Sequence, residues 1–199
     1  MESIWTQTCN HREKRPALDR QIEADVAVIG GGMAGILTAW QLEQARVRTV
    51  VLGADQHGQG QTNNTTAKIT VQHGLFCHTF LAKKGEETAR KYVQANQQAV
   101  EEYKRIIQET KIDCNFEETD AFVYSKDAGK LMQDAEAAKR LGLDVSLERH
   151  LEIPVDCNGT DRFFGQPQFH PLKFICELAT GLQIYADTLV PGDEAHHLR

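Results

Sequence analysis

The sequence D-V-A-V-I-G-G-G-M-A-G-I-L-T-A-W-Q-L-E-Q-A-R-V-R-T-V-V-L, residues 25–52, decides the fold class of this chain. The apolar run Val26–Ile29 is followed by a glycine turn and by the helical pattern Met33–Ala45. A second apolar run ends at Leu52. A strand, a glycine turn, a helix and a strand in this order predict the βαβ unit of a Rossmann-like α/β fold.

The glycines of the turn have the G-x-G-x-x-G spacing of a dinucleotide-binding site. Gly30 permits the sharp exit from the strand, Gly32 lets a pyrophosphate approach the backbone, and Gly35 lets the helix pack close to the strand. The N-terminus of the helix adds N–H groups and a partial positive charge, which favour phosphate. The residues expected to line the cofactor here are Gly30, Gly31, Gly32, Met33, Ala34 and Gly35.

The acidic residue of this fingerprint is missing. An Asp or Glu that binds ribose hydroxyls follows the second strand, about 20 residues after the turn. Here Leu52 is followed by Gly53, and the next acid is Asp55. Hydrogen bonds to a charged group contribute roughly 1.5–3 kcal/mol, so we expect weaker dinucleotide binding unless Asp55 substitutes for the acid. We also expect Gly53→Glu to tighten binding.

The overall composition disfavours some classes of binding partner. The chain has 199 residues, 41% hydrophobic and 25% charged, with a formal net charge of -6. This balance argues against nucleic acid or an anionic membrane as the main partner. The longest apolar stretch, Val26–Leu37, is too short and too rich in glycine to span a membrane. We expect a cytoplasmic protein.

The five cysteines indicate neither a disulfide framework nor a metal site. They are odd in number and scattered, and none forms a C-x-x-C motif. Cys9-x-His11 is half of a Rieske-type pair, but no second half exists in the chain. No metal is therefore expected.

The rest of the chain divides into a long polar loop, Gly53–Gly74, and several regular elements. Helices are predicted over Lys83–Thr110, Asp127–Leu141 and Pro171–Ala179. Strands are predicted over Cys114–Phe116, Ala121–Tyr124, Leu143–Leu147, Phe163–Phe169 and Leu182–Val190. On the long helix, Glu87/Lys91 and Glu101/Arg105 have the spacing of supporting ion pairs.

Several motifs together carry a family resemblance. They are Ser3-Ile4-Trp5, the glycine turn, Gly60-Gln61-Thr62-Asn63-Asn64-Thr65-Thr66-Ala67-Lys68-Ile69-Thr70, Gln72-His73-Gly74, Ile112-Asp113-Cys114, and Gln166-Pro167-Gln168-Phe169-His170-Pro171-Leu172-Lys173. From Ser3 to about Val190 the chain resembles the N-terminal part of the D-amino-acid-oxidase-like FAD-dependent oxidoreductases. The nearest branch is the bacterial one that often carries a C-terminal Rieske domain.

The resemblance implies FAD as the cofactor and assigns roles along the loop. Thr65, Thr66, Ala67 and Lys68 would follow the pyrophosphate and the ring, and the backbone of Val190 would meet the adenine. Lys68 would either place a positive charge near the flavin or simply close a polar loop. His73 has a flavin-facing and a structural alternative.

The resemblance also implies how Gln168 and His170 are used. Both would sit at the crossing back to the FAD domain. There His170 would order the turn rather than transfer protons.

The implied architecture is a Rossmann-like FAD-binding βαβ core of the D-amino-acid-oxidase type with part of an α+β substrate domain, incomplete. Residues 1–80 would form the FAD-binding segment and cofactor loop, 81–168 a partial substrate domain, and 169–199 the return to the FAD domain and a truncated tail. Members of the family are longer. The FAD-domain sheet would therefore keep about three strands and an exposed edge, through which the chain could associate.

The leading functional hypothesis is a truncated FAD-dependent oxidoreductase that oxidises a small amine or amino acid by hydride transfer to the flavin. No residue pair is specific enough to name as catalytic. Two alternatives remain open. One is a non-catalytic remnant with weak or no FAD binding, and the other is an interaction module that another chain completes. An NAD-linked dehydrogenase fits the Thr-Thr-Ala-Lys loop less well.

Overall fold

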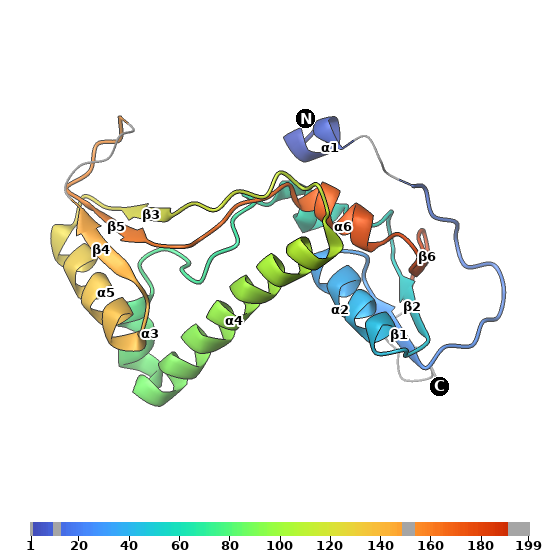
Figure 1. The fold of residues 1–199 in the computed structure, drawn as a ribbon, viewed down its shortest axis with the longest axis horizontal. Coiled ribbons are helices and arrows are strands. Elements are labelled where there is room, and N and C mark those ends of the chain that lie inside the picture. Colours follow the sequence, from blue (N-terminus) through green and yellow to red (C-terminus); the bar gives the residue numbers. More distant parts are fainter. Residues whose placement is uncertain (1, 10–12, 149–153, 191–199) are drawn as a thin grey trace. The chain divides into compact units, whose positions relative to one another are not determined.

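The computed structural model describes residues 2–9, 13–148 and 154–190, and Figure 1 shows their helices and strands. The elements are α1 (Ile4–Thr8), β1 (Val26–Ile29), α2 (Met33–Gln44), β2 (Thr49–Leu52), the 3-10 helix η1 (Gly60–Asn64), α3 (Cys77–Lys84), α4 (Glu86–Thr110), β3 (Ala121–Tyr124), α5 (Ala128–Leu141), β4 (Val145–Glu148), β5 (Thr160–Phe163), α6 (Pro171–Leu178) and β6 (Gln183–Tyr185). The predicted tail beyond Val190 lies outside the described residues.

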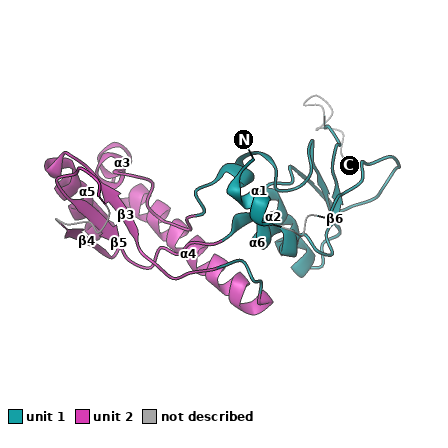
Figure 2. Ribbon diagram, turned by 90° about the horizontal axis from the view of Figure 1, so that it is seen from above, with its two compact units in different colours: residues 1–67, 112–115, 170–199 teal, residues 68–111, 116–169 magenta. Residues whose placement is uncertain are grey.

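The chain forms two compact units, coloured separately in Figure 2. Unit 1 comprises residues 1–67, 112–115 and 170–199, and unit 2 comprises residues 68–111 and 116–169. The sequence placed segment boundaries at 80/81 and 168/169. The boundaries between the compact units lie instead at 67/68 and 169/170. Residues 112–115 also belong to unit 1.

Unit 1 is built on a parallel three-stranded sheet in the order β1-β2-β6. β1 and β2 pair in the register Val28↔Val51, and β2 and β6 in the register Val51↔Ile184. β2 is buried along its whole length, as expected for a central parallel strand. β1 has a neighbour on one side among the described residues, and its last residue, Ile29, is 56% exposed. The expected three strands and exposed edge are thus present.

The βαβ prediction is confirmed. β1 has the predicted bounds, and α2 ends one residue before the predicted Ala45. Ile36 and Ala39 are buried on α2, which packs against β1, β2 and α6. Ile36 and Ala39 are three residues apart, so they share one face of α2, as the helical spacing in the sequence predicts.

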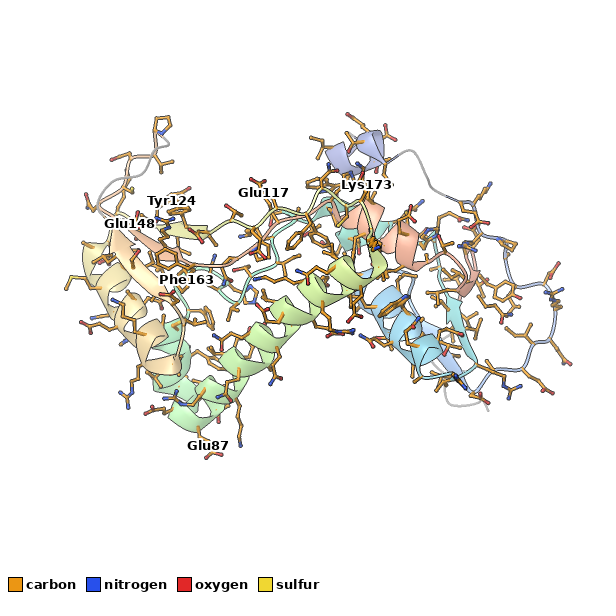
Figure 3. The ribbon with its side chains drawn as sticks, in the orientation of Figure 1. Glu87, Glu117, Tyr124, Glu148, Phe163 and Lys173 are labelled. Carbon is orange, nitrogen blue, oxygen red and sulfur yellow. The ribbon has the colours of Figure 1, made fainter. Side chains whose placement is uncertain are left out.

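Unit 2 holds an antiparallel sheet in the order β3-β5-β4. α5 packs against β4 and β5, and α3 packs against α5 and α4. Figure 3 labels Phe163 at the end of β5, which is almost completely buried. The other side chains of unit 2 that are nearly inaccessible include Val71, Val93, Ile106, Leu131 and Leu141. This sheet with its covering helices agrees with the α+β character that was predicted for the second part of the chain.

The predicted long helix is wrong at its start. The chain forms two helices that meet at Gly85, whose φ of 77° lies in the left-handed region. Glu87 and Lys91 form the expected ion pair at 2.7 Å. The predicted Glu101/Arg105 pair is wrong, because Arg105 pairs with Glu102 and Glu109.

Two predicted strands are also wrong. Cys114–Phe116 is irregular, and the third strand of the antiparallel sheet is Thr160–Phe163 rather than Phe163–Phe169. A hydrophobic pattern does not predict β5, because most of its residues are polar. Its sequence is T-D-R-F, and Thr160 and Asp161 are buried. The last predicted strand shortens to Gln183–Tyr185.

Two carboxylates are buried in unit 2. Asp161 on β5 and Asp134 on α5 are both nearly inaccessible, and within the described residues neither oxygen of Asp161 has a hydrogen-bond partner. Oδ1 of Asp134 accepts a hydrogen bond from the His78 amide at 2.9 Å. Burial, followed by the charge of Asp134, raises the pKa of Asp161 to about 7, and Lys139 opposes this shift. Burial and the same two acids raise the pKa of the neighbouring Cys77 thiol to about 12.

These carboxylates predict that unit 2 is less stable at pH 8 than at pH 5. The pKa of Asp161 is higher in the folded chain than in the unfolded chain, so from about pH 4 to about pH 7 the folded state binds the proton more strongly. The stabilisation that this proton gives the folded state is lost as the pH rises through that range. Relative to wild type, Asp161→Asn should gain up to about 1.4 kcal/mol per pH unit over that range. Denaturant unfolding at several pH values measures this difference.

The matched control is Asp156→Asn, since the exposed Asp156 pairs with Lys126 at the surface. A difference between wild type and Asp161→Asn that stays constant with pH would contradict a raised pKa of Asp161 in the folded chain.

Candidate functional site

The glycine turn lies where β1 ends and α2 begins. Gly30 has a φ of 107°, which side chains rarely adopt, and its amide donates to the carbonyl oxygen of Leu52 at 2.8 Å. A Cβ on Gly35 would lie 1.8 Å from the carbonyl oxygen of Gly30. No side chain fits there, so helix and strand make the close approach that this spacing predicts.

A loop after β2 packs against the turn. The Gly58 amide donates to the carbonyl oxygen of Gly31 at 2.8 Å. A Cβ on Gly31 would lie 3.2 Å from Cα of His57, a residue that is 2% exposed. His57 was not found by sequence reasoning, because a single histidine in a polar loop carries no spacing signal.

Thr62 holds the first turn of α2. Its Oγ1 accepts a hydrogen bond from the Met33 amide at 3.0 Å and would lie 3.4 Å from a Cβ on Gly32. One of the amides that a helix N-terminus leaves without a partner is thus satisfied from η1. Within the described residues the amides of Gly32 and Ala34 donate no hydrogen bond. The sequence motif that contains Thr62 does not indicate this role.

Gly53 has a structural reason to lack a side chain. Its amide donates to the carbonyl oxygen of Tyr185, and its own carbonyl oxygen accepts from the Thr188 amide, each at 2.8 Å. A Cβ on Gly53 would lie 2.8 Å from the backbone oxygen of Asp55. Gly53→Glu therefore forces the loop to move and does not simply restore an acid. The side chain of Asp55 itself is exposed.

The Thr65–Ala67 segment is held by Trp5 and by a hydrogen bond of its own. Trp5 donates from Nε1 to the carbonyl oxygen of Thr65 at 2.9 Å, and the Ala67 amide donates to Oγ1 of Thr65 at 3.3 Å. Ala67 is buried and has a φ of 62°, which is costly for a residue with a side chain. Strained backbone of this kind concentrates at functional segments. Thr66 is exposed.

α1 is attached to the same loop. The hydroxyl groups of Ser3 and Thr6 each donate to Oδ1 of Asn63 at 2.6 Å. Together with the Trp5 bond, these contacts explain why Ser3-Ile4-Trp5 and the Asn-Thr-rich loop occur in one chain. The N-terminal segment and the loop are one structural assembly within unit 1.

His170 orders the start of α6, as the sequence predicted. Its Nδ1 accepts a hydrogen bond from the Lys173 amide at 3.2 Å, and its Nε2 lies 2.9 Å from Oγ1 of Thr8. Because Nδ1 is an acceptor, the ring is neutral with its proton on Nε2. Burial, followed by the charge of Lys173, lowers the pKa of His170 and agrees with that form. Figure 3 labels Lys173 on α6.

The remaining predicted residues are distributed over both units. Val190 lies in unit 1, half-buried against Val50, Leu52 and Tyr185 at the end of the sheet. Lys68 is the first residue of unit 2, and it is exposed. Its backbone forms an isolated antiparallel β-bridge with that of Gln168. His73 is exposed in unit 2, its ring 6.0 Å from that of Phe76.

Among residues 2–9, 13–148 and 154–190, no three His, Cys, Asp or Glu side chains are grouped as a metal site. Nor is any helix of that part of the chain long and apolar enough to cross a bilayer.

The turn fits the pyrophosphate of a dinucleotide. Glycine stands at each place where a Cβ would meet backbone or close the approach to the helix N-terminus. Residues 25–193 match the model of the family described as FAD dependent oxidoreductase, and the chain belongs to this family.

A curated relative supports the predicted branch. The chain is 36% identical over 196 residues to the putative Rieske 2Fe-2S iron-sulfur protein YhfW of Bacillus subtilis (strain 168). The alignment covers 94% of this chain and 38% of the relative. The chain thus spans well under half the length of the curated relative it matches.

Solved structures share the fold. An L-proline dehydrogenase from P. horikoshii has a TM-score of 0.68 at 18% identity, covering 89% of this chain and 46% of that one. An L-amino acid deaminase from Proteus vulgaris has a TM-score of 0.67 at 16% identity, covering 89% and 48%. The predicted fold class, an incomplete fold of the D-amino-acid-oxidase type, is confirmed.

Alanine substitutions at Gly35 and at Gly32 are expected to differ in their effect on stability. Gly35→Ala should destabilise unit 1 by at least about 3 kcal/mol, since its methyl group would overlap the Gly30 carbonyl group. Gly32→Ala should change stability by less than about 1 kcal/mol, because Gly32 has an ordinary φ of -85° and its Cβ would only touch Thr62.

Thermal or denaturant unfolding of both variants checks this pair, with Thr38→Ala on the exposed face of α2 as control. Equal stability of the two glycine variants would contradict the described strand–helix contact.

Proposed function

We propose that unit 1 binds FAD with the pyrophosphate against the turn Gly30–Gly35. The observation that carries this proposal is the glycine turn at the N-terminus of α2, where amides of Gly32 and Ala34 have no acceptor within the described residues. Phosphate oxygens accept hydrogen bonds from such amides, and the helix dipole favours their negative charge. The family match supports FAD over other dinucleotides.

Further residues of unit 1 are assigned to the ribose and the adenine of the cofactor. Asp55 is the acid that substitutes for the missing carboxylate at the ribose, and its exposure leaves it able to turn toward a hydroxyl group. We assign the adenine to the backbone at Val190, which packs on the sheet beside Tyr185. With a glycine in place of the acid, binding should be weaker than an intact fingerprint provides.

The Thr65–Lys68 segment is proposed to follow the cofactor toward its ring. The strained, buried Ala67 fixes the path of the backbone, and Thr66 offers an exposed hydroxyl group. Lys68 comes next in the chain with an exposed ammonium group, which would stabilise negative charge on a reduced flavin. Thr62 and Trp5 hold this loop through the hydrogen bonds described above and act as positioning residues.

The proposed reaction class is the oxidation of a small amine or amino acid. Bound flavin supplies the chemistry by accepting hydride at N5 from the carbon next to nitrogen. The protein's share is to bind, orient and shield from water. The solved structures of similar fold include an L-amino acid deaminase, an L-proline dehydrogenase and a glycine oxidase from Geobacillus kaustophilus, which support this substrate class.

Titration with FAD tests the binding proposal. Wild type should take up one FAD per chain, with a yellow flavin spectrum and quenched flavin fluorescence after gel filtration. Gly32→Ala should fold normally yet bind at least about tenfold more weakly, because its methyl group stands in the phosphate approach. Thr38→Ala should bind as wild type does. A folded wild-type chain that leaves FAD fluorescence unquenched would overturn the proposal.

A second candidate function is an interaction module that another chain completes. The observation in its favour is that β1 pairs on one side only within the part of the chain that the structure describes, with Ile29 exposed, since such an edge is a ready template for another strand.

This alternative predicts an oligomer that depends on the edge. Wild type should elute from gel filtration as a dimer or larger species, and Ile29→Lys should shift it to the monomer because a charge opposes strand pairing. Met132→Lys, which changes a similarly exposed apolar residue on α5, is the control. A wild-type monomer at all concentrations would argue against self-association through β1.

A further inference from the structure

Two cysteines that are far apart in the sequence meet in unit 1. Sγ of Cys9 lies 4.0 Å from Sγ of Cys176, and each residue is 8% exposed. Both are thiols in the structure. A disulfide bond requires about 2.05 Å between the sulfur atoms, so closing the pair needs a movement of about 2 Å. Cys9 is the C-cap residue of α1, and its backbone is extended rather than helical.

α1 has few other means of attachment. The helix has five residues and buries none of them. Isolated helices of this length are not stable in water. Its hold on unit 1 consists of the Trp5, Ser3 and Thr6 hydrogen bonds to the loop and the contacts of Thr8 and Trp5 with His170. A covalent bond at Cys9 would therefore change how firmly α1 holds Asn63 and Thr65.

We propose that Cys9 and Cys176 form a redox-sensitive site, in which a peroxide closes a disulfide bond that fixes α1 against α6. One thiolate attacks the peroxide O–O bond, giving a sulfenic acid and one water molecule. The other thiol attacks the sulfenic sulfur, forming the S–S bond and releasing a second water molecule. Two thiols are oxidised, the two peroxide oxygens are reduced, and a dithiol reagent reverses the bond.

The consequence of this bond concerns the loop at Asn63–Thr65, and this part of the inference rests on the proposed FAD site. With α1 fixed, Trp5 stays on the carbonyl group of Thr65. Opening of the loop then becomes rarer. Oxidation is thus expected to slow the release of FAD.

Peptide mapping of the full chain tests the disulfide bond without reference to FAD. The reduced chain is treated with a small excess of hydrogen peroxide, the remaining thiols are alkylated, and the digest is examined by mass spectrometry. We expect a peptide that joins Cys9 to Cys176 and disappears after dithiothreitol. The melting temperature of the oxidised wild type should rise by about 5 °C or more.

Two variants each remove one cysteine of the pair, and a third serves as the matched control. Cys9→Ala and Cys176→Ala should lose both the linked peptide and the rise in melting temperature, whereas Cys157→Ala, at a half-buried position in unit 2, should retain both. The inference is overturned if Cys9 and Cys176 are still alkylated after Cys157 has been oxidised. A peptide that joins Cys176 to Cys114 instead would also overturn it.

Flavin release separates this inference from the proposed function. We expect FAD to leave the oxidised wild type severalfold more slowly than the reduced one, with no such difference in Cys9→Ala. If the disulfide bond forms but neither state binds FAD, the FAD proposal fails and the redox site stands. If FAD binds and the bond does not form, the redox site fails and the FAD proposal stands.

Discussion

The close approach of Gly35 to the Gly30 carbonyl group is the constraint on which unit 1 depends. A Cβ at Gly35 would lie 1.8 Å from that oxygen, so the contact exists only because Gly35 carries no side chain. It brings the N-terminus of α2 to the carboxyl end of β1, which is where ligands bind in parallel α/β sheets. Thr62 and His57 then pack on the turn from the segment that follows β2.

That segment links the turn to the rest of unit 1. It passes Gly53, whose backbone is bonded to Tyr185 and Thr188, and ends at the strained Ala67. α1 holds its last part through Asn63 and Thr65, and His170 holds α1 through Thr8. A side chain at position 53 would therefore collide with the backbone of this loop. In the proposed function the ribose is bound by Asp55, two residues further along the chain.

The sequence was sufficient where a local rule determines structure, and it failed where distant residues do. Glycine spacing and apolar periodicity predicted β1, α2 and β2, since each rule involves neighbours along one element. Asp161 shows the opposite case, because a buried acid on β5 contradicts the hydrophobic pattern and is tolerated by its raised pKa. The roles of Thr62 and His57 depend on contacts with the turn about 30 and 26 residues earlier in the chain, which no spacing rule describes.

Hydrogen–deuterium exchange with and without FAD tests the central claim most directly. We expect FAD to protect the amides of Gly32 and Ala34 and those of the loop 60–67, because phosphate oxygens accept from the first two and the cofactor covers the loop. Amides on the exposed face of α5 in unit 2 should exchange at the same rate in both samples. Protection that appears elsewhere, with residues 30–36 unchanged, would contradict a cofactor site built on the glycine turn.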